Sequence, residues 1–396
     1  MQIRRTTAVV AATVVTASLT LAACGSSKKT TGTTNGSSGG AKKTVEIGFQ
    51  GPLSVNSPQL GLNAEYGMKV AIAQANAKGD LPYTLALKVV DDQGSGDVSP
   101  TSAQQLVDDS SVVAVVGPMF STATKNAEPK FSAAGLLSVT PSATAPTLTQ
   151  QGFTSFFRLI PNDVAQGTGA ADYIAKVLNA KSVYSLDDKE TYGIGLATAL
   201  NAQLDKDGVK VTKDSILKTT NYTSEADKIV AANPDVLYYS GYYPEFALLA
   251  KALKGKGFKG TLMSGDGSND DQYTKQAGAS VAEGTYLTCG CGDLNSDPTA
   301  ADFVKAVADD NSGAKPGTYT GEAYDAANSI ISVLKTLGTS PTRAQVLTAY
   351  KTVDYKGLTK EVKYDSSGEI AGTVIYIYQV KNGVRTVLGT TDQLIK

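Results

Sequence analysis

The feature that most constrains the fold of this chain is a regular alternation of two kinds of segment, which starts near Thr44. Short apolar runs of strand length, rich in Val, Leu, Ile and Tyr, alternate with longer segments of helical periodicity. This order is typical of βαβ units, in which parallel strands form a sheet covered by helices. We predict strands at residues 45–49, 85–90, 112–116, 136–140, 182–185, 236–240, 261–264 and 373–380, and helices at residues 67–76, 165–178, 195–204, 245–254, 299–309 and 322–337.

The length of the chain indicates two such α/β lobes. With 396 residues the chain exceeds a single ordinary core, because domains typically contain about 100 to 200 residues. Hydrophobic residues make up 41% of the chain and charged residues 18%, a balance that supplies enough apolar side chains for packed interiors. The predicted fold class is therefore α/β, with parallel sheets in two similar lobes.

Two features of the composition argue against whole classes of function. The formal net charge of −1 leaves no excess of Lys and Arg to neutralise phosphates, so we expect no nucleic-acid partner. The chain contains no His and therefore lacks the commonest general base and zinc ligand. We accordingly expect a protein that is not an enzyme and that holds neither a metal nor a cofactor.

The N-terminus has the pattern of an export signal. Arg4 and Arg5 precede an apolar stretch at residues 8–19, and Leu21-Ala22-Ala23 leads into Cys24. Small residues before a cysteine resemble the bacterial lipobox, in which the signal peptide is cut before a cysteine that carries a lipid. We predict a signal peptide at residues 1–23, lipid attachment at Cys24, and a flexible tether of Ser, Gly, Thr and Lys at residues 24–43. An ordinary secretory peptide with a chance cysteine is the alternative.

Polar residues gather directly after the predicted strands, where open parallel sheets bind their ligands. Ser121 follows the strand at 112–116, and we predict that it is the N-cap of a helix, where free N–H groups suit a carboxylate. Ser142 and Thr144 follow the next strand in the same manner. The second half of the chain offers aromatic rings and one carboxylate at the equivalent positions, namely Tyr192, Tyr242 and Asp266.

This distribution of groups favours one kind of ligand. The first half provides neutral hydroxyl and amide donors, which suit an anion, and the second half provides a carboxylate, which suits a cation. A ligand charge left unpaired in a closed cleft costs roughly 1 to 3 kcal/mol or more. A zwitterionic amino acid satisfies both halves, so we prefer it to a simple acid, an amide or a sugar.

Four segments resemble the leucine/isoleucine/valine-binding proteins of ABC importers. Two of them follow strands in the first half, at residues 117–124 and 140–149. The others have the patterns Asp-Lys-x-x-Tyr-Gly-x-Gly within residues 187–195 and Tyr-Tyr-x-Gly-Tyr-x-Pro-Glu within residues 236–245. The similarity extends from Val45 to Gln379. The resemblance therefore concerns nearly the whole chain after the tether.

The resemblance implies the type I periplasmic-binding fold, with two Rossmann-like lobes joined by a three-stranded hinge. Lobe 1 would comprise residues 44–160 and 292–360, and lobe 2 residues 161–291 and 361–396. Ser121, Ser142 and Thr144 would hold the α-carboxylate of the ligand through hydroxyls and backbone amides, Ala143 included. Asp266 would pair with the α-ammonium, Tyr192 and Tyr242 would close over the ligand backbone, and Tyr319 would lie near the ligand side chain.

The chain departs from the family pattern at three places. Asp266 stands where the family commonly has Glu, and its shorter reach would shift the ligand or admit a water. The loop at residues 51–62 is longer than usual, which leaves the side-chain specificity open. Cys289 and Cys291 lie away from the family's usual disulfide, and they either pair with each other or remain free thiols.

The expected function is that of an extracytoplasmic lipoprotein that captures an amino acid of the branched-chain type or a related one. Hinge closure would trap the ligand, and the monomeric protein, anchored to the bacterial cell membrane by its lipid, would deliver the ligand to an ABC permease. A lipid-anchored sensory module is an alternative that uses the same surfaces. A hydrolase with Ser121 as nucleophile and Lys125 as base is the alternative from another class.

Overall fold

The computed structural model describes residues 42–395. The predicted signal peptide, Cys24 and nearly all of the tether therefore lie outside the described residues. Within the described part, none of the helices combines the length and the apolar character needed to span a bilayer.

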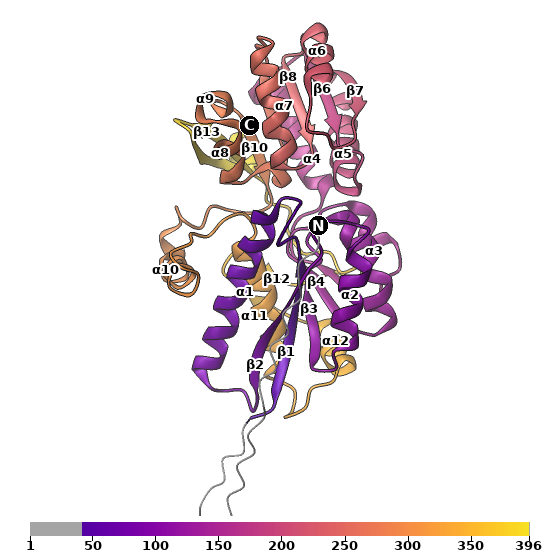
Figure 1. Ribbon diagram of the computed structural model, residues 1–396, viewed down its shortest axis with the longest axis vertical. Coiled ribbons are helices and arrows are strands. Elements are labelled where there is room, and N and C mark those ends of the chain that lie inside the picture. Colours follow the sequence, from indigo (N-terminus) through magenta and orange to yellow (C-terminus); the bar gives the residue numbers. More distant parts are fainter. Residues whose placement is uncertain (1–41, 396) are drawn as a thin grey trace, which may run out of the picture. The chain divides into compact units, whose positions relative to one another are not determined.

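The first part of the chain forms a parallel sheet with strand order β2-β1-β3-β4-β5. Its strands are β1 (Thr44–Gly51), β2 (Thr84–Asp91), β3 (Val112–Val116), β4 (Leu137–Thr140) and β5 (Phe156–Arg158). Helices α2 and α3 pack against each other, and α1 packs against α11, on opposite sides of the sheet (Figure 1). The helices associated with this sheet are α1 (Pro58–Lys78), α2 (Ser99–Asp108), α3 (Ser121–Ala133), α11 (Thr320–Leu334) and α12 (Arg343–Tyr350).

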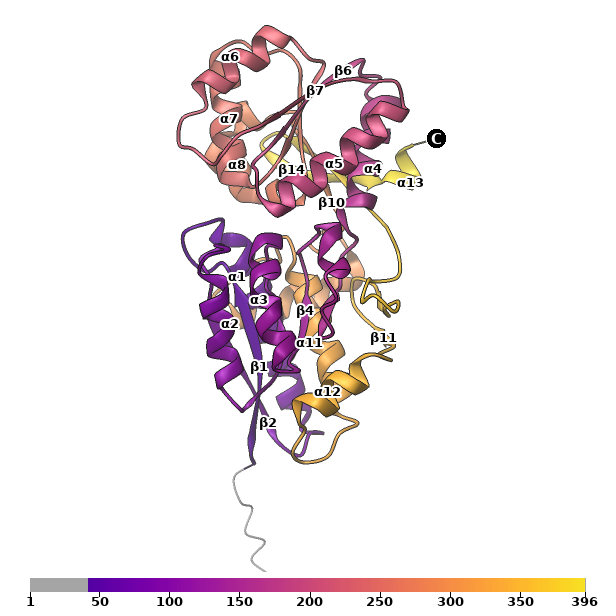
Figure 2. The ribbon, with the colours of Figure 1, turned by 90° about the vertical axis from the view of Figure 1, so that its right-hand side faces the viewer.

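A second sheet has the order β14-β13-β10-β9-β8-β6-β7. The five strands from β6 to β10 are parallel, and β13 and β14 add an antiparallel edge. These strands are β6 (Ser182–Asp187), β7 (Lys210–Ser215), β8 (Val236–Ser240), β9 (Thr261–Ser264), β10 (Tyr286–Cys289), β13 (Tyr376–Lys381) and β14 (Val384–Thr390). The accompanying helices labelled in Figure 2 are α4 (Asp163–Asp172), α5 (Thr191–Lys206), α6 (Thr223–Ala232), α7 (Tyr243–Gly255), α8 (Asp271–Ala277) and α13 (Thr391–Leu394). The short helix α9 (Ala279–Ala282) is labelled in Figure 1.

Shorter elements complete the chain. A π-helical turn continues α4. Helix α10 (Ala301–Asp310) packs on α1. Strand β11 (Tyr355–Lys356) pairs with β12 (Glu361–Val362). Single 3₁₀ turns are η1 (Pro146–Gln150), η3 (Asp266–Ser268) and η4 (Pro298–Ala300).

The chain passes between the two sheets three times. The first connecting segment follows β5, the second follows β10, and the third precedes β13. This topology confirms the predicted fold class of two α/β lobes with parallel sheets joined by a three-stranded hinge. The residues at which the lobes divide stay a prediction.

Glu128 lies in the interior of the first lobe and makes stability depend on pH. It is fully buried on α3, where it accepts a hydrogen bond from the hydroxyl of Ser138, while its Oε2 has no hydrogen-bond partner among the described residues. Burial raises the pKa of Glu128 to about 8. Between the unfolded pKa, near 4.5, and about 8 the folded state holds more protons than the unfolded state, so stability falls as pH rises.

We therefore expect the free energy of unfolding to fall by roughly 1 kcal/mol per pH unit across that window on account of this one group. Urea unfolding at several pH values should show a flatter profile for Glu128→Gln than for the natural protein. Glu361→Gln, at an exposed position, is the matched control and should leave the slope unchanged. Equal slopes for Glu128→Gln and the natural protein would contradict this account.

Candidate functional site

The eight predicted ligand-binding residues are all buried, and most of them directly follow strands. Six of them follow one of the strands β3, β4, β8 and β9. Tyr192 lies in the first turn of α5, which follows β6, and Tyr319 immediately precedes α11. Their exposed fractions range from 1% to 6%. Polar side chains so deeply buried at the carboxyl edges of two sheets need partners, either within the protein or on a ligand. These residues are Ser121, Ser142, Ala143, Thr144, Tyr192, Tyr242, Asp266 and Tyr319.

Asp266 lies at the centre of a hydrogen-bond network. Its Oδ1 accepts from the hydroxyl of Tyr192 at 2.6 Å and from Nε2 of Gln166 at 2.7 Å, and its Oδ2 accepts from the hydroxyl of Tyr319 at 2.7 Å. Burial raises the pKa of Asp266, although these hydrogen bonds oppose the shift. The structure thus brings Asp266, Tyr192 and Tyr319 together. A Cβ on the preceding Gly265 would meet the Tyr192 hydroxyl at 2.6 Å, which explains the glycine at that position.

A second buried carboxylate, Asp163, was not predicted from the sequence. It is the first residue of α4, after the N-cap Asn162, and neither of its carboxylate oxygens has a hydrogen-bond partner among the described residues. Burial and the negative charge of Asp266 raise the pKa of Asp163 well above its usual range, although the neighbouring Thr144 hydroxyl and the charge of Arg158 oppose the shift. Two buried acids whose charges act on each other favour a cation beside them, because a positive charge would allow both to ionise.

The hydroxyl groups of Ser121, Ser142 and Thr144 differ in the hydrogen bonds that they make within the protein. Ser121 is the first residue of α3 and not its N-cap, which is Phe120, so that prediction was wrong. The Ser121 hydroxyl instead accepts a hydrogen bond from the amide of Ala145 at 3.2 Å. Ser142 donates to the carbonyl of Met119 at 2.6 Å. Thr144 Oγ1 is buried without a partner among the described residues, and it is therefore the donor best placed to meet a ligand.

Aromatic rings from both lobes meet beside this network. Tyr242 packs against Tyr192 with ring centroids 5.3 Å apart, and against Phe120 at 4.4 Å. The ammonium of Lys218 lies 4.9 Å from the centre of the Tyr242 ring. Phe120 was also not predicted, because its segment was interpreted as a source of hydrogen bonds. Rings from the two lobes therefore pack against each other beside Asp266 and its tyrosine partner.

Hydrogen bonds join residues of the two lobes at positions near the site. The hydroxyl of Thr122 donates to Glu190 Oε2 at 2.7 Å and accepts from the amide of Thr191 at 3.1 Å. Asn63 Nδ2 donates to Asp270 Oδ2 at 2.9 Å. The structure therefore represents a conformation in which the lobes are in direct contact around the candidate site.

Arg158 holds the loop that carries three of the predicted ligand residues. The side chain is fully buried at the end of β5, and its NH1 donates to the carbonyl of Ala145 at 2.7 Å and to that of Ala143 at 3.3 Å. Its charge is paired with Glu369, to which Nε donates at 2.9 Å. This arrangement fixes the backbone on both sides of Thr144.

The structure gives no support to the alternative of a hydrolase with Ser121 as nucleophile and Lys125 as base. Lys125 is exposed, and within residues 42–395 no hydrogen bond joins it to Ser121. Among the same residues, no group of three or more Cys, Asp or Glu side chains is placed to hold a metal ion. Cys289 and Cys291, left open by the sequence, form a disulfide.

Comparisons with known proteins agree with this architecture. The family model described as periplasmic binding protein matches residues 44–385. An "Amino acid binding protein" of Pseudomonas aeruginosa is 30% identical over 83% of this chain and 89% of its own length. A "Leu/Ile/Val-binding protein" of Rhizobium johnstonii is 30% identical over 87% of this chain and 93% of its own length.

Solved structures show the same fold. The branched-chain amino acid transporter substrate-binding protein LivJ of Streptococcus pneumoniae, in complex with isoleucine, aligns with a TM-score of 0.79 and 25% identity over 88% of this chain and 100% of its own. A solute-binding protein of R. palustris, in complex with benzoate, aligns with a TM-score of 0.78 and 17% identity over 89% of this chain and 96% of its own. The two-lobe topology, the buried site at the strand ends and these matches together establish that the chain belongs to the periplasmic binding protein family, as a relative of the Leu/Ile/Val-binding proteins.

Proposed function

We propose that this protein captures an amino acid between its two lobes for delivery to an ABC importer. The observation that carries the proposal is the pair of buried carboxyl groups, Asp163 and Asp266, together with the unpaired hydroxyl of Thr144. A ligand ammonium between the acids relieves their repulsion, and the ligand carboxylate accepts hydrogen bonds from Thr144 and from neighbouring hydroxyls and amides. The names of the relatives, which refer to amino acids, support this assignment.

The proposed mechanism is closure of the lobes on the ligand. Asp266, from the second lobe, already accepts a hydrogen bond from Tyr319, at the start of α11 in the first. A ligand that bridges the same groups stabilises the closed arrangement relative to an open one, since it gains contacts only when both lobes reach it. The closed arrangement is then the form that the membrane partner recognises.

We propose further that the protein acts outside the cytoplasm as a monomer, held to the membrane by a lipid on Cys24. The support for this part is the sequence of residues 1–43, with its export pattern, its cysteine after small residues and its polar tether. Metabolic labelling with a radioactive fatty acid tests it. Cys24→Ser should abolish incorporation of the label, and continued incorporation would contradict the assignment.

A thermal-shift screen tests the ligand class. Because a ligand that binds only the folded state raises the melting temperature, an amino acid at 100 times its Kd should stabilise the protein by about 2.7 kcal/mol. The screen should include the branched-chain amino acids, other amino acids, their amides and sugars. A shift with sugars or amides and none with any amino acid would overturn the proposed function.

Thr144→Val tests the carboxylate side of the site. The substitution preserves the shape of the side chain and removes a buried hydroxyl that has no hydrogen-bond partner among the described residues. We expect amino-acid affinity to fall about 10- to 150-fold, which corresponds to the roughly 1.5 to 3 kcal/mol of one hydrogen bond to a charged group. Calorimetric titration measures the change, and Thr101→Val, at an exposed position on α2, is the control. Unchanged affinity would remove Thr144 from the site.

A further inference from the structure

A cavity of about 310 Å³ lies among the segments that connect the lobes, and none of the eight predicted ligand-binding residues lines it. Its walls include Pro161 from the first connecting segment, Gly290 and Gly292 from the second, and Gly372 and Val374 from the third. The first two segments touch closely, because a Cβ on Gly290 would meet the ring of Pro161 at 2.8 Å. A molecule in this cavity therefore contacts all three strands of the hinge.

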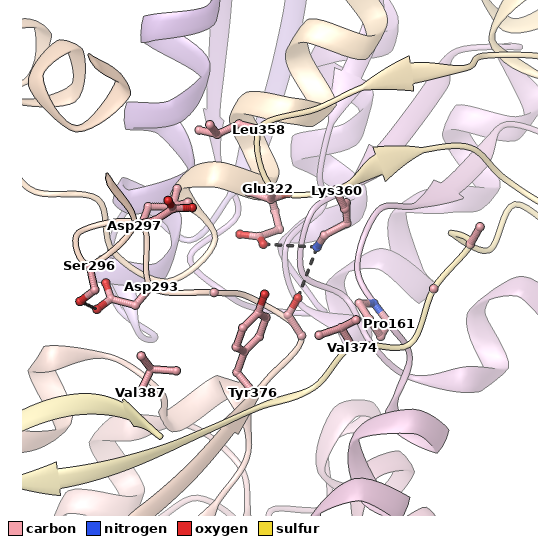
Figure 3. Close-up of a pocket in the computed structure, with 16 residues that line it drawn as sticks. Pro161, Asp293, Ser296, Asp297, Glu322, Leu358, Lys360, Val374, Tyr376 and Val387 are labelled. Carbon is pink, nitrogen blue, oxygen red and sulfur yellow. Dashed lines mark hydrogen bonds and ion pairs between the residues drawn. The ribbon is translucent and has the colours of Figure 1, made fainter. Parts of the chain in front are cut away.

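The lining of the cavity combines carboxylates with one aromatic ring. Figure 3 shows Asp293, Asp297, Glu322 and Lys360 arranged around Tyr376. The ammonium of Lys360 lies 3.3 Å from Glu322 Oε1 and donates to the carbonyl of Gly290 at 3.3 Å, so the single cation of the lining is already paired. The two aspartates remain as excess negative charge.

Local hydrogen bonds orient both aspartates. Asp293 accepts from the hydroxyl of Ser296 at 2.6 Å, and Asp297 accepts from the amide and the hydroxyl of Thr299 at 2.8 and 2.7 Å. The bonds from Thr299 lower the pKa of Asp297. Burial and the charges of Glu322 and Asp297 raise the pKa of Tyr376, which indicates that negative potential reaches its ring.

Beside the hydroxyl residues Ser296 and Thr359, most of the other side chains of the wall are apolar, and the volume suits a small organic molecule. Leu294, Leu358, Val374 and Val387 contribute aliphatic side chains. Ligand pockets typically have volumes of about 300 to 1,000 Å³, so this cavity lies at the small end of the range. Carboxylates beside an aromatic face and aliphatic walls are the chemistry that recognises an ammonium group on a short hydrocarbon.

We propose that this hinge cavity is a second binding site, which takes a small organic amine and alters the affinity of the first site. The wall of the cavity combines Glu322 on α11, in the first lobe, with Tyr376 on β13 and Val387 on β14, in the second. An amine that contacts both lobes while they are joined by hydrogen bonds favours that conformation and strengthens amino-acid binding. This second effect rests on the proposed function, whereas amine binding itself does not.

Butylammonium is the probe, with 1-butanol as its neutral analogue and butyrate as its anionic analogue. Butylammonium should raise the melting temperature of the full-length protein in the absence of amino acids, and the two analogues should not. Asp297→Asn keeps the cap on η4, because Asn is as good an N-cap as Asp, and should weaken butylammonium binding at least fivefold. Tyr376→Leu should weaken it as well, and Asp302→Asn, exposed on α10, should leave it unchanged.

Two further measurements separate this inference from the proposed function. Butylammonium should still bind Asp266→Asn, since that residue is not part of the cavity lining, and saturating butylammonium should lower the Kd of the natural protein for its amino acid at least threefold. The inference would be overturned if Asp266→Asn no longer bound butylammonium, or if 1-butanol or butyrate raised the melting temperature as much as butylammonium does. An amino-acid Kd that saturating butylammonium leaves unchanged would overturn it as well. Retained butylammonium binding by a protein that binds no amino acid would count against the proposed function alone.

Discussion

Asp266→Asn should lower the affinity for the amino acid on the order of 30-fold to several thousandfold. The substitution keeps the size of the side chain but removes the negative charge that is proposed to pair with the ligand ammonium. Loss of one partner from a buried, hydrogen-bonded charge pair costs about 2 to 5 kcal/mol, and each 1.4 kcal/mol is a factor of ten in Kd. Titration calorimetry on the purified variant measures the loss.

The fold should survive this substitution, because the amide oxygen of an asparagine side chain can still accept from Tyr192 and Gln166, while its NH2 group can donate to the hydroxyl of Tyr319. Circular dichroism should therefore match that of the natural protein. Asp302→Asn removes an equal charge at an exposed position on α10 and is the matched control for affinity. A Kd for Asp266→Asn within twofold of the control would place the ammonium elsewhere.

Arg158→Met should produce the largest loss of stability of all the proposed substitutions. Breaking a buried ion pair by removing one partner costs about 3 to 5 kcal/mol, and the two backbone carbonyls of Ala143 and Ala145 lose their donor as well. Urea unfolding should therefore show a markedly lower midpoint. Amino-acid affinity should also fall, because the loop that carries Thr144 loses its support.

Arg343→Met separates these two effects. Arg343 is also held by backbone carbonyls, with bonds of 2.9 Å to Val112 and 2.7 Å to Asp109, but these lie away from the loop at 142–145. It should lower stability and leave amino-acid affinity unchanged. If Arg158→Met retained full affinity in its folded form, the proposed positioning role would be wrong.

The architecture was largely predictable because long apolar runs mark the central strands. The predicted strand 112–116 is β3 with the same bounds, and its five residues are all buried. Strands without such a run were missed. β7 (Lys210–Ser215) lies at the edge of its sheet with mostly exposed polar side chains, and β5 (Phe156–Arg158) has only three residues. Edge position and short length both weaken the periodic signal on which such predictions depend.

The site was predictable only in part, for related reasons. Asp163 follows β5, so missing that strand also hid the carboxylate that follows it, although the sequence Asn162-Asp163 has the form of a helix start. Ser121 was predicted to be the N-cap of α3, but the N-cap is the preceding residue, Phe120, whose backbone is extended. The Ser121 hydroxyl instead accepts a hydrogen bond from the amide of Ala145. Arg158 contacts its partner Glu369 across more than 200 positions, which no local pattern reveals.

The central claim is that the site recognises both charges of an amino acid at once. Titration calorimetry with three ligands of one shape tests it directly: leucine, 4-methylpentanoate, which lacks the ammonium, and 3-methylbutylamine, which lacks the carboxylate. We expect measurable binding of leucine and at least tenfold weaker binding of each analogue, since each leaves one half of the site unpaired. Binding of 4-methylpentanoate as tight as that of leucine would contradict it.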